Sequence, residues 1–272
     1  MLIEYYFMSF FETNVLQFLG VEIRGIDCSK PLNFQESCLL LDNFHQYHLL
    51  IIKEQQLTEE KLIQISQLFG EPVPSLLPSY RLEKFPVITK HTNAKDTNKS
   101  PIGAMAPEDV YHSDSYFSAN PSKATLLYSL KSPAYGGETC FANMCFAYET
   151  LDESIKHFIA DKKAIYKNAY INQPPVAHPL VRVHSVTQKK ALFANIHRAL
   201  GIDALEKNEA LSLLEELYEH AINPRFIYKH KWQDGDLLIW NNPVTMHCAT
   251  HINDSQERLL YRILTKGDLP VV

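Results

Sequence analysis

A histidine and an aspartate stand two residues apart in the stretch YHSDSYFS, residues 111–118. Alternate side chains of a β-strand project from the same face, so a strand here would point His112 and Asp114 the same way, roughly 6–7 Å apart. An imidazole nitrogen and a carboxylate oxygen placed like this can begin a metal site. The pair is short enough to arise by chance, so alone it does not establish one.

A metal bound by His112 and Asp114 needs a further ligand from elsewhere in the chain. The best candidate is His247, which we expect at the end of a short loop after the apolar run LLIW. His251 is the second choice, because its polar neighbours suggest a solvent-facing position. Two histidines and one carboxylate on one face of a metal leave positions open, as in non-haem Fe(II) oxygenases. A structural zinc site is instead closed and tetrahedral, and usually contains cysteine.

Two arginines alternate with leucines in the stretch RLLYRILTK, residues 258–266. In a strand, Arg258, Leu260 and Arg262 share one face. An arginine on an otherwise apolar face is costly unless it meets an anion. The pattern therefore predicts either an anion-binding face or two surface arginines on an exposed edge strand, and by itself it does not decide between them.

The elements that must position these residues can be read from hydrophobic periodicity and from turn residues. A helix that Thr58 caps is expected to end at Gly70. Prolines and polar residues make 71–109 irregular, and we interpret about 72–109 as a lid over the site. No repeat or linker is apparent, so a single domain over 1–272 is expected. Further strands are expected at 21–27, 49–53, 123–132, 226–232, 237–241 and 258–266, and helices at 32–48 and 204–222.

Composition limits the class of protein. The chain has 272 residues, 46% of them hydrophobic and 21% charged, with a formal net charge of -5. This fits a globular core and argues against general nucleic-acid binding, since no basic excess exists to meet phosphates. No apolar run is long enough for a membrane span. Five scattered cysteines and an acidic N-terminus without a signal-peptide pattern favour a reducing, cytoplasmic compartment. Whether translation starts at Met1 or Met8 is left open.

The chain resembles the taurine dioxygenase (TauD/TfdA-like) family of Fe(II)/2-oxoglutarate-dependent oxygenases. The resemblance runs from about 21 to 270 and is carried by motifs in order: VEIRGID, FGE, HSD, GGET, HPLVRVH and GDLLIWNN, followed by His247 and the two arginines. Each motif alone is weak, but their order and spacing together are specific. The resemblance implies a mainly β fold with flanking helices, whose core is a double-stranded β-helix, a cupin-like jelly roll.

The resemblance also implies a cofactor and a cosubstrate. His112, Asp114 and His247 would hold Fe(II), and Arg258 would bind the distal carboxylate of 2-oxoglutarate with help from Thr139 of GGET. A planar guanidinium can donate two parallel hydrogen bonds to a carboxylate. Oxidative decarboxylation of 2-oxoglutarate by O2, with release of succinate and CO2, would then supply the oxidant.

The substrate implied by the resemblance is a small anionic organic molecule. Arg262 matches an arginine that binds the sulfonate in taurine dioxygenase, and Tyr80 matches a substrate-contacting tyrosine. Leu77 stands where that enzyme has a sulfonate-binding histidine, and Arg198 where it has a phenylalanine. These differences argue against taurine and favour another carboxylate, sulfonate or sulfate ester. No nucleic acid or membrane partner is expected, and a homo-oligomer is left open.

Hydroxylation is the expected reaction. Halogenation is disfavoured, because it requires the carboxylate ligand to be replaced by a small residue and Asp114 is present. Desaturation or oxidative rearrangement would use the same iron centre and stays open. A protein that binds metal and 2-oxoglutarate without turnover is the alternative from another class.

Overall fold

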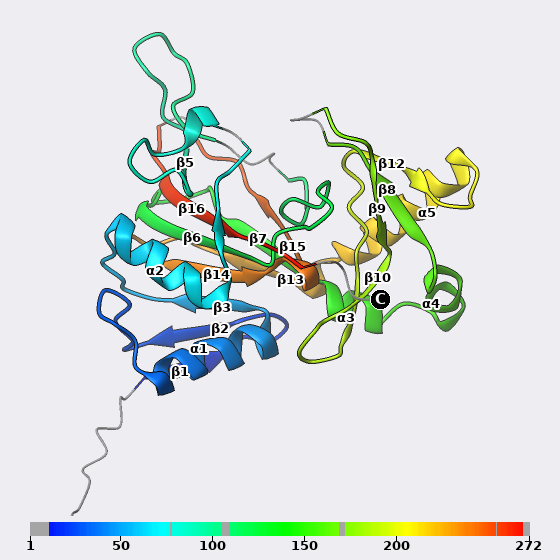
Figure 1. Ribbon diagram of the computed structural model, residues 1–272, viewed down its shortest axis with the longest axis horizontal. Coiled ribbons are helices and arrows are strands. Elements are labelled where there is room, and N and C mark those ends of the chain that lie inside the picture. Colours follow the sequence, from blue (N-terminus) through cyan, green and yellow to red (C-terminus); the bar gives the residue numbers. More distant parts are fainter. Residues whose placement is uncertain (1–10, 77, 105–108, 169–171, 254, 269–272) are drawn as a thin grey trace, which may run out of the picture.

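Two β-sheets face each other across a layer of buried side chains in the computed structural model (Figure 1). This model describes residues 11–268 except 77, 105–108, 169–171 and 254. The shared layer contains Leu127, Phe141, Trp240 and Leu260, which come from strands of both sheets. This is the expected jelly-roll core.

The larger sheet has the strand order β1-β2-β3-β14-β6-β16-β4, and β5 also pairs with β16. The smaller facing sheet has the order β13-β7-β15. Every pairing in them is antiparallel except β2 with β3. The strands are β1 (Glu12–Val15), β2 (Val21–Arg24), β3 (Leu49–Ile52), β4 (Pro72–Val73), β5 (Ile88–Thr92), β6 (Ala124–Lys131), β7 (Thr139–Asn143), β13 (Ile227–His230), β14 (Leu237–Asn241), β15 (Thr245–Ala249) and β16 (Leu259–Thr265).

Two helices cover the outer face of the larger sheet, α1 (Phe34–Tyr47) and α2 (Glu59–Phe69). Asn33 and Glu36 form a capping box at the start of α1, which satisfies backbone N–H groups that have no partner inside the helix. Thr58 caps α2, and the chain leaves that helix at Gly70 as the sequence predicts. The buried faces of both helices pack on the sheet, so these elements agree with the hydrophobic periodicity.

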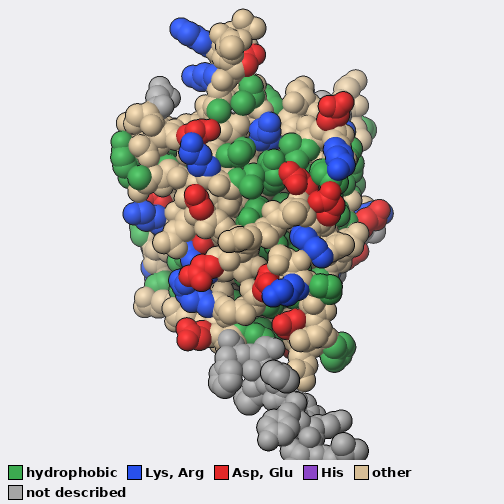
Figure 2. Space-filling view, turned by 90° about the vertical axis from the view of Figure 1, so that its left-hand side faces the viewer, with side chains coloured by type: hydrophobic (Ala, Val, Ile, Leu, Met, Phe, Trp, Pro, Cys, Tyr) green, Lys and Arg blue, Asp and Glu red, His purple; other side chains and the backbone are tan. Residues whose placement is uncertain are grey.

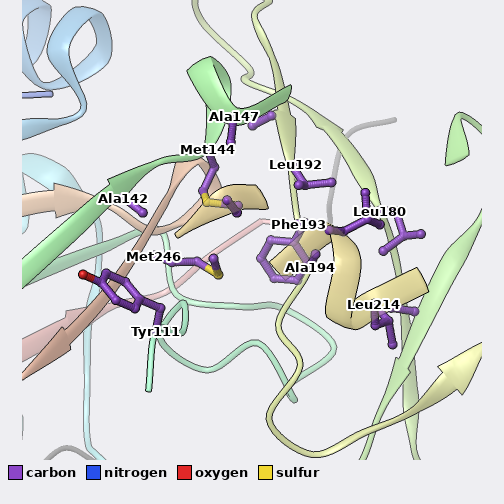
Figure 3. Close-up of a cluster of buried hydrophobic side chains, with 14 of the residues drawn as sticks. Tyr111, Ala142, Met144, Ala147, Leu180, Leu192, Phe193, Ala194, Leu214 and Met246 are labelled. Atoms are coloured by element: carbon purple, nitrogen blue, oxygen red, sulfur yellow. The ribbon is translucent and has the colours of Figure 1, made fainter. Parts of the chain in front are cut away.

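A third layer covers the smaller sheet on the side away from the larger one (Figure 1). Met144, Met246 and Phe193 point into the buried cluster between them (Figure 3). The expected helix at 204–222 is α5 (Lys207–Ala221) and buries Leu214 there. The layer contains α3 (Met144–Glu149), α4 (Glu153–Ile159), α5, the sheet β12 (Ala199–Ile202)–β8 (Lys163–Tyr166)–β9 (Val176–Pro179) and the pair β10 (Val181–Val183) and β11 (Lys190–Leu192).

The expectation that 71–109 is structureless is wrong. Within it, β5 pairs along its length with β16, and β4 adds two residues to the same sheet. A short 3-10 helix, η1 (Pro78–Tyr80), lies between them. A strand this short among prolines has little local signal, and it forms because β16, far along the chain, supplies its hydrogen-bond partners. After β5 the chain projects away from the sheet and returns (Figure 1).

The charge on the surface and the length of the helices indicate which kinds of partner the protein could bind. Lys and Arg side chains are interspersed with Asp and Glu on the face in Figure 2, without a broad patch of one sign. In the described part of the chain, no helix combines the length and apolar character needed to cross a membrane. All five cysteines are free thiols.

Three buried histidines make the fold sensitive to acid. Burial lowers the pKa of His48 to about 3 and those of His178 and His184 to about 4. These folded-state values lie below the unfolded value of about 6.5, so the unfolded chain binds more protons between the two. The stability that these three neutral histidines contribute is therefore fully present above pH 6.5, and it is lost as the pH falls toward 4.

We expect the free energy of unfolding to fall by several kcal/mol between pH 7 and pH 4.5, since each pKa unit corresponds to about 1.4 kcal/mol. Urea unfolding at constant ionic strength, followed by circular dichroism, measures this. A free energy that is flat over this range would contradict the assignment of neutral, buried histidines.

Candidate active site

Three side chains that the sequence singled out converge at one end of the core. Ligand atoms of His112, Asp114 and His247 lie within 4.8 Å of one another. His247 Nε2 is 3.7 Å from Asp114 Oδ2, and the two imidazole rings have centroids 4.5 Å apart. Asp114 and His247 are buried, while His112 is partly exposed. Two nitrogens and one oxygen, open to one side, fit a divalent iron and do not complete a tetrahedral zinc site.

The backbone brings these ligands together differently from the expectation. His247 lies within β15, not in a loop, and exchanges two backbone hydrogen bonds with His112, of 3.0 and 2.8 Å. The HSD stretch is not a continuous strand, because pairing is limited to His112 and the chain turns after Ser113, with Ser115 at φ 57°. The turn is held by side chains from distant segments. The backbone N–H of Ser113 donates a hydrogen bond to Asn195 Oδ1, and that of Asp114 donates to Asn242 Oδ1.

A hydrogen-bonded chain orients the Asp114 carboxylate. Thr125 Oγ1 donates to Asp114 Oδ2 at 2.6 Å, and Asn242 Nδ2 donates to that hydroxyl at 2.8 Å. Trp240 Nε1 in turn donates to Asn242 Oδ1. Arg262 Nη1 lies 3.2 Å from the other carboxylate oxygen. Both oxygens of Asp114 are therefore fixed before any metal binds.

The protonation states suit metal ligation. Burial alone would raise the pKa of Asp114, but Arg262 and the two histidines lower it well below its usual value. Burial lowers the pKa of His247 to about 3, against the opposing effect of Asp114. A carboxylate and a neutral imidazole are the forms that bind metal.

The Thr125 hydroxyl should be needed for full metal affinity. Thr125→Val keeps the shape of the side chain but removes the hydrogen bond to Asp114. We expect metal affinity to fall roughly 10–100-fold, the usual effect of losing a group that orients a ligand. Equilibrium dialysis with Fe(II) under anaerobic conditions measures it. Thr89→Val, on the inner face of β5, is a matched buried control that should keep wild-type affinity, and equal affinities for all three proteins would contradict this role.

A cavity next to the ligands contains both arginines. Arg258 is 3% exposed and the Arg262 side chain 15%. Because β6 lies on one side of β16 and β5 and β4 lie on the other, the alternative of surface arginines on an edge strand is wrong. The described residues that line the cavity are His91, Leu127, Thr139, Trp240, His247, Ala249, Arg258, Leu260 and Arg262.

Thr139 and Arg258 line the same cavity although they are far apart in the chain. Two hydrogen bonds fix the position of Arg258. Its Nη1 donates to Gly137 O at 2.9 Å, and its backbone N–H donates to Asn93 Oδ1. Thr139 Oγ1 accepts from Trp232 Nε1 at 3.1 Å. The predicted pair for 2-oxoglutarate is thus assembled in one place, and the guanidinium is fixed in orientation.

The other candidates for substrate contact lie outside this cavity. Tyr80 ends η1 and is half-buried, and Leu77 is outside the described residues. Arg198 is half-buried in a turn with φ 64°. The pKa of its neighbour His197 is lowered by burial and by the charges of Arg198 and His112, so this turn lies near His112. His251, the second choice as a ligand, is exposed and outside the cluster.

The sequence did not point to His91, the one titratable residue among the described cavity residues that was not predicted. His91 of β5 pairs with Leu260 and faces the cavity between the two arginines. It is 6% exposed, and burial and both arginines lower its pKa well below the usual value. A strand assignment for 88–92 would have revealed it, because His91 then shares the inward face with Thr89.

Comparisons with known proteins agree with this geometry. Residues 12–264 match the family model described as Taurine catabolism dioxygenase TauD, TfdA family. The chain is 29% identical over 276 residues to an alpha-ketoglutarate-dependent 2,4-dichlorophenoxyacetate dioxygenase from Cupriavidus pinatubonensis, covering 92% of this chain and 95% of that protein. It is 28% identical to an alkylsulfatase from Acinetobacter baylyi, over 92% of this chain and 83% of that one.

A solved structure shares the whole architecture. The crystal structure of a taurine dioxygenase from Burkholderia xenovorans superposes with a TM-score of 0.85 at 27% identity, covering 96% of this chain and 92% of that one. The family model spans nearly the whole chain, and the motifs, the jelly roll and the His-Asp-His cluster all point the same way. The chain belongs to the TauD/TfdA family and is a 2-oxoglutarate-dependent dioxygenase.

Proposed function

We propose that the protein holds Fe(II) through His112, Asp114 and His247 and uses 2-oxoglutarate and O2 to hydroxylate a small anionic organic substrate, releasing succinate and CO2. The observation that carries this proposal is the His-Asp-His cluster beside a buried cavity with two arginines. Three protein ligands leave three positions for cosubstrate and oxygen. With these bound, the metal supplies the oxidant for the C–H bond.

The residues of the chain position the reactants and keep water away. Arg258 and Thr139 would hold the distal carboxylate of 2-oxoglutarate, so that its keto-acid end points toward the metal ligands. Leu127, Trp240 and Leu260 form the apolar part of the wall. In such an environment a charge-assisted hydrogen bond is stronger than in water. Asp114 stays ionised through its pairing with Arg262.

The unpaired Nε of Arg262 is the reason to expect an acidic group on the substrate. Its Nη1 is used by Asp114, but its Nε is buried and has no hydrogen-bond partner among the described residues. An anion placed over the metal ligands would satisfy it. The names of the similar proteins refer to a phenoxyacetate, an alkyl sulfate and taurine, all of which are acids. Arg198, in the turn near His112, could meet a second acidic or polar group.

The substrate class can be tested with a panel of small carboxylates, sulfonates and sulfate esters, screened for succinate formation with Fe(II) and 2-oxoglutarate. We expect an acid other than taurine to give the largest stimulation. Arg262→Met should raise the KM for that acid by roughly 10–100-fold, the loss of a charge-assisted contact. Product analysis by mass spectrometry separates hydroxylation from desaturation, which adds no oxygen.

Two results would contradict this substrate assignment. One is that taurine proves the best substrate. The other is that the best substrate is neutral and that Arg262→Met leaves its KM unchanged. The exposed Arg225→Met is the control for the loss of a positive charge.

We also propose that the whole chain is one catalytic domain, and that the described residues 93–104, part of the lid expected at about 72–109, help to cover the cavity. Asn93, at the start of this segment, contacts both the backbone N–H of Arg258 and the carbonyl of Gln256. Ala104, at its other end, is bridged to His91. The lid is thus anchored at the cosubstrate end of the cavity. A cytoplasmic location suits the five free thiols.

A further inference from the structure

A second cavity lies where the C-terminal end of α1 approaches β10, and it shares no lining residue with the active-site cavity. Arg182 of β10, Lys123 before β6 and His45 of α1 contribute to its wall. It offers ≈ 70 Å³ of space to the centres of water molecules. A single water needs roughly 10–15 Å³ on this measure, so the cavity has room for several waters or one small ion.

Arg182 is a buried arginine in the wall of this cavity. It is 4% exposed, and its guanidinium carbon lies 3.3 Å from the centre of the Phe193 ring, which fixes the plane of the group. Within the described residues its Nε and Nη2 have no hydrogen-bond partner, and it forms no ion pair. Burial lowers the pKa of Arg182 to about 9. A buried arginine without an anion is costly, so an anion from outside would stabilise this arrangement.

The neighbouring groups add a positive charge and an unpaired ring nitrogen. Lys123 is half-buried and forms no ion pair within the described chain. Burial lowers the pKa of both His45 and His184, and the charge of Lys123 lowers them further. The Nδ1 of His45 is buried and has no hydrogen-bond partner in the described part of the chain. His184 is already engaged, because its Nδ1 accepts two backbone N–H groups and its Nε2 meets the Asn241 amide.

The one acid among the described lining residues is Asp268, which is exposed. It makes no ion pair with Arg182 or Lys123 in the part of the chain that the structure describes. Because Asp268 is exposed, its carboxylate is screened by water and opposes an anion in the cavity only weakly. The cavity therefore holds two cations against one exposed carboxylate, and the unpaired guanidinium nitrogens of Arg182 meet no acid of the described chain.

We propose that this second cavity binds a small tetrahedral oxyanion, of the sulfate or phosphate kind, between Arg182 and Lys123. A guanidinium donates two parallel hydrogen bonds to two oxygens of such an anion, and an ammonium adds a point charge. The space suits an inorganic ion and not a nucleotide. This site is separate from the substrate and 2-oxoglutarate cavity.

The test is the binding of inorganic sulfate to the full-length protein, by calorimetric titration and thermal unfolding. Sodium chloride at matched ionic strength is the control for salt effects on stability. The arginines of the active site also attract anions, so the titration is repeated in an Arg258→Met/Arg262→Met double variant. We expect one saturable site, with a melting temperature raised by roughly 5 °C at a hundredfold excess over Kd, and the same site in the double variant.

Two substitutions locate the site. Arg182→Met should abolish sulfate binding. Lys123→Gln, at a half-buried position, should weaken sulfate binding roughly tenfold, and it provides the test if Arg182→Met does not fold. The proposal is overturned if sulfate acts no differently from chloride, if Lys123→Gln binds it like wild type, or if binding disappears in the active-site double variant. It is also overturned if sulfate binds only after Asp268→Asn, because Asp268 would then be the anion that Arg182 meets.

Discussion

Asp114→Ala should abolish succinate formation. The substitution removes one of the three proposed metal ligands and breaks the contact of that carboxylate with Thr125. Loss of a group that merely orients a ligand costs metal affinity roughly 10–100-fold, so loss of the ligand itself should cost more than ~100-fold in activity. Oxygen consumption and succinate release with Fe(II) and 2-oxoglutarate measure the effect, and equilibrium dialysis reports the metal.

Controls are needed to distinguish loss of activity from loss of folding in Asp114→Ala. Asp114→Ala leaves Arg262 without its carboxylate, which can cost about 3–5 kcal/mol of stability, so circular dichroism accompanies the assay. His112→Gln removes a ligand without touching that ion pair and should be equally inactive. Asp152→Ala changes an exposed carboxylate that makes no capping hydrogen bond and should stay fully active. Wild-type oxygen consumption by a folded Asp114→Ala protein would refute the metal site.

Arg258→Met should weaken the binding of 2-oxoglutarate by roughly 30- to 5,000-fold. The buried guanidinium is fixed by Gly137, and the proposed carboxylate partner would lie in the same cavity as Thr139. Truncating one member of a buried, hydrogen-bonded charge pair costs about 2–5 kcal/mol, which corresponds to that range. Isothermal titration with 2-oxoglutarate, under anaerobic conditions with metal present, measures the affinity directly.

Two comparisons make the Arg258 result specific. Arg258→Lys keeps the charge but loses the planar fork, so its affinity should lie between those of wild type and Arg258→Met. Metal binding without 2-oxoglutarate should be unchanged in both variants, because Arg258 contacts none of the three ligands in any hydrogen bond described here. An Arg258→Met protein that binds 2-oxoglutarate as tightly as wild type would remove this arginine from the cosubstrate site.

The two predictions depend on different amounts of sequence information. Simple alternation predicts one face for Arg258, Leu260 and Arg262. Arg258 lies one residue before β16, and all three line the same cavity, which confirms the shared face. Asp114 was paired with His112 on the assumption of a strand, and that assumption is wrong. The three residues do cluster, as the order of motifs along the chain implied. The local geometry was not predicted, because the turn after Ser113 has no signature beyond its polar residues.

Some elements were strongly encoded in the local sequence. The helix from Thr58 to Gly70 has a cap, a buried stripe and a terminating glycine, all within one short segment. The strand β14 is a continuous apolar run, as expected for a strand buried on both faces. In such segments the local preference and the tertiary packing agree, so the sequence is sufficient.

Sequence alone determined the fold that such a motif order implies, and it singled out the residues proposed to carry the chemistry, namely the two histidines, the aspartate and the arginines. Tertiary structure decided their arrangement. Thr125 and Asn242 orient Asp114, although 11 and 128 residues separate them from it, and Asn195 fixes the turn from 82 residues away. His91 enters the cavity only because β5 pairs with β16. Hydrogen bonds between such distant residues leave no periodic pattern along the chain, since they exist only once the sheets have closed around the core.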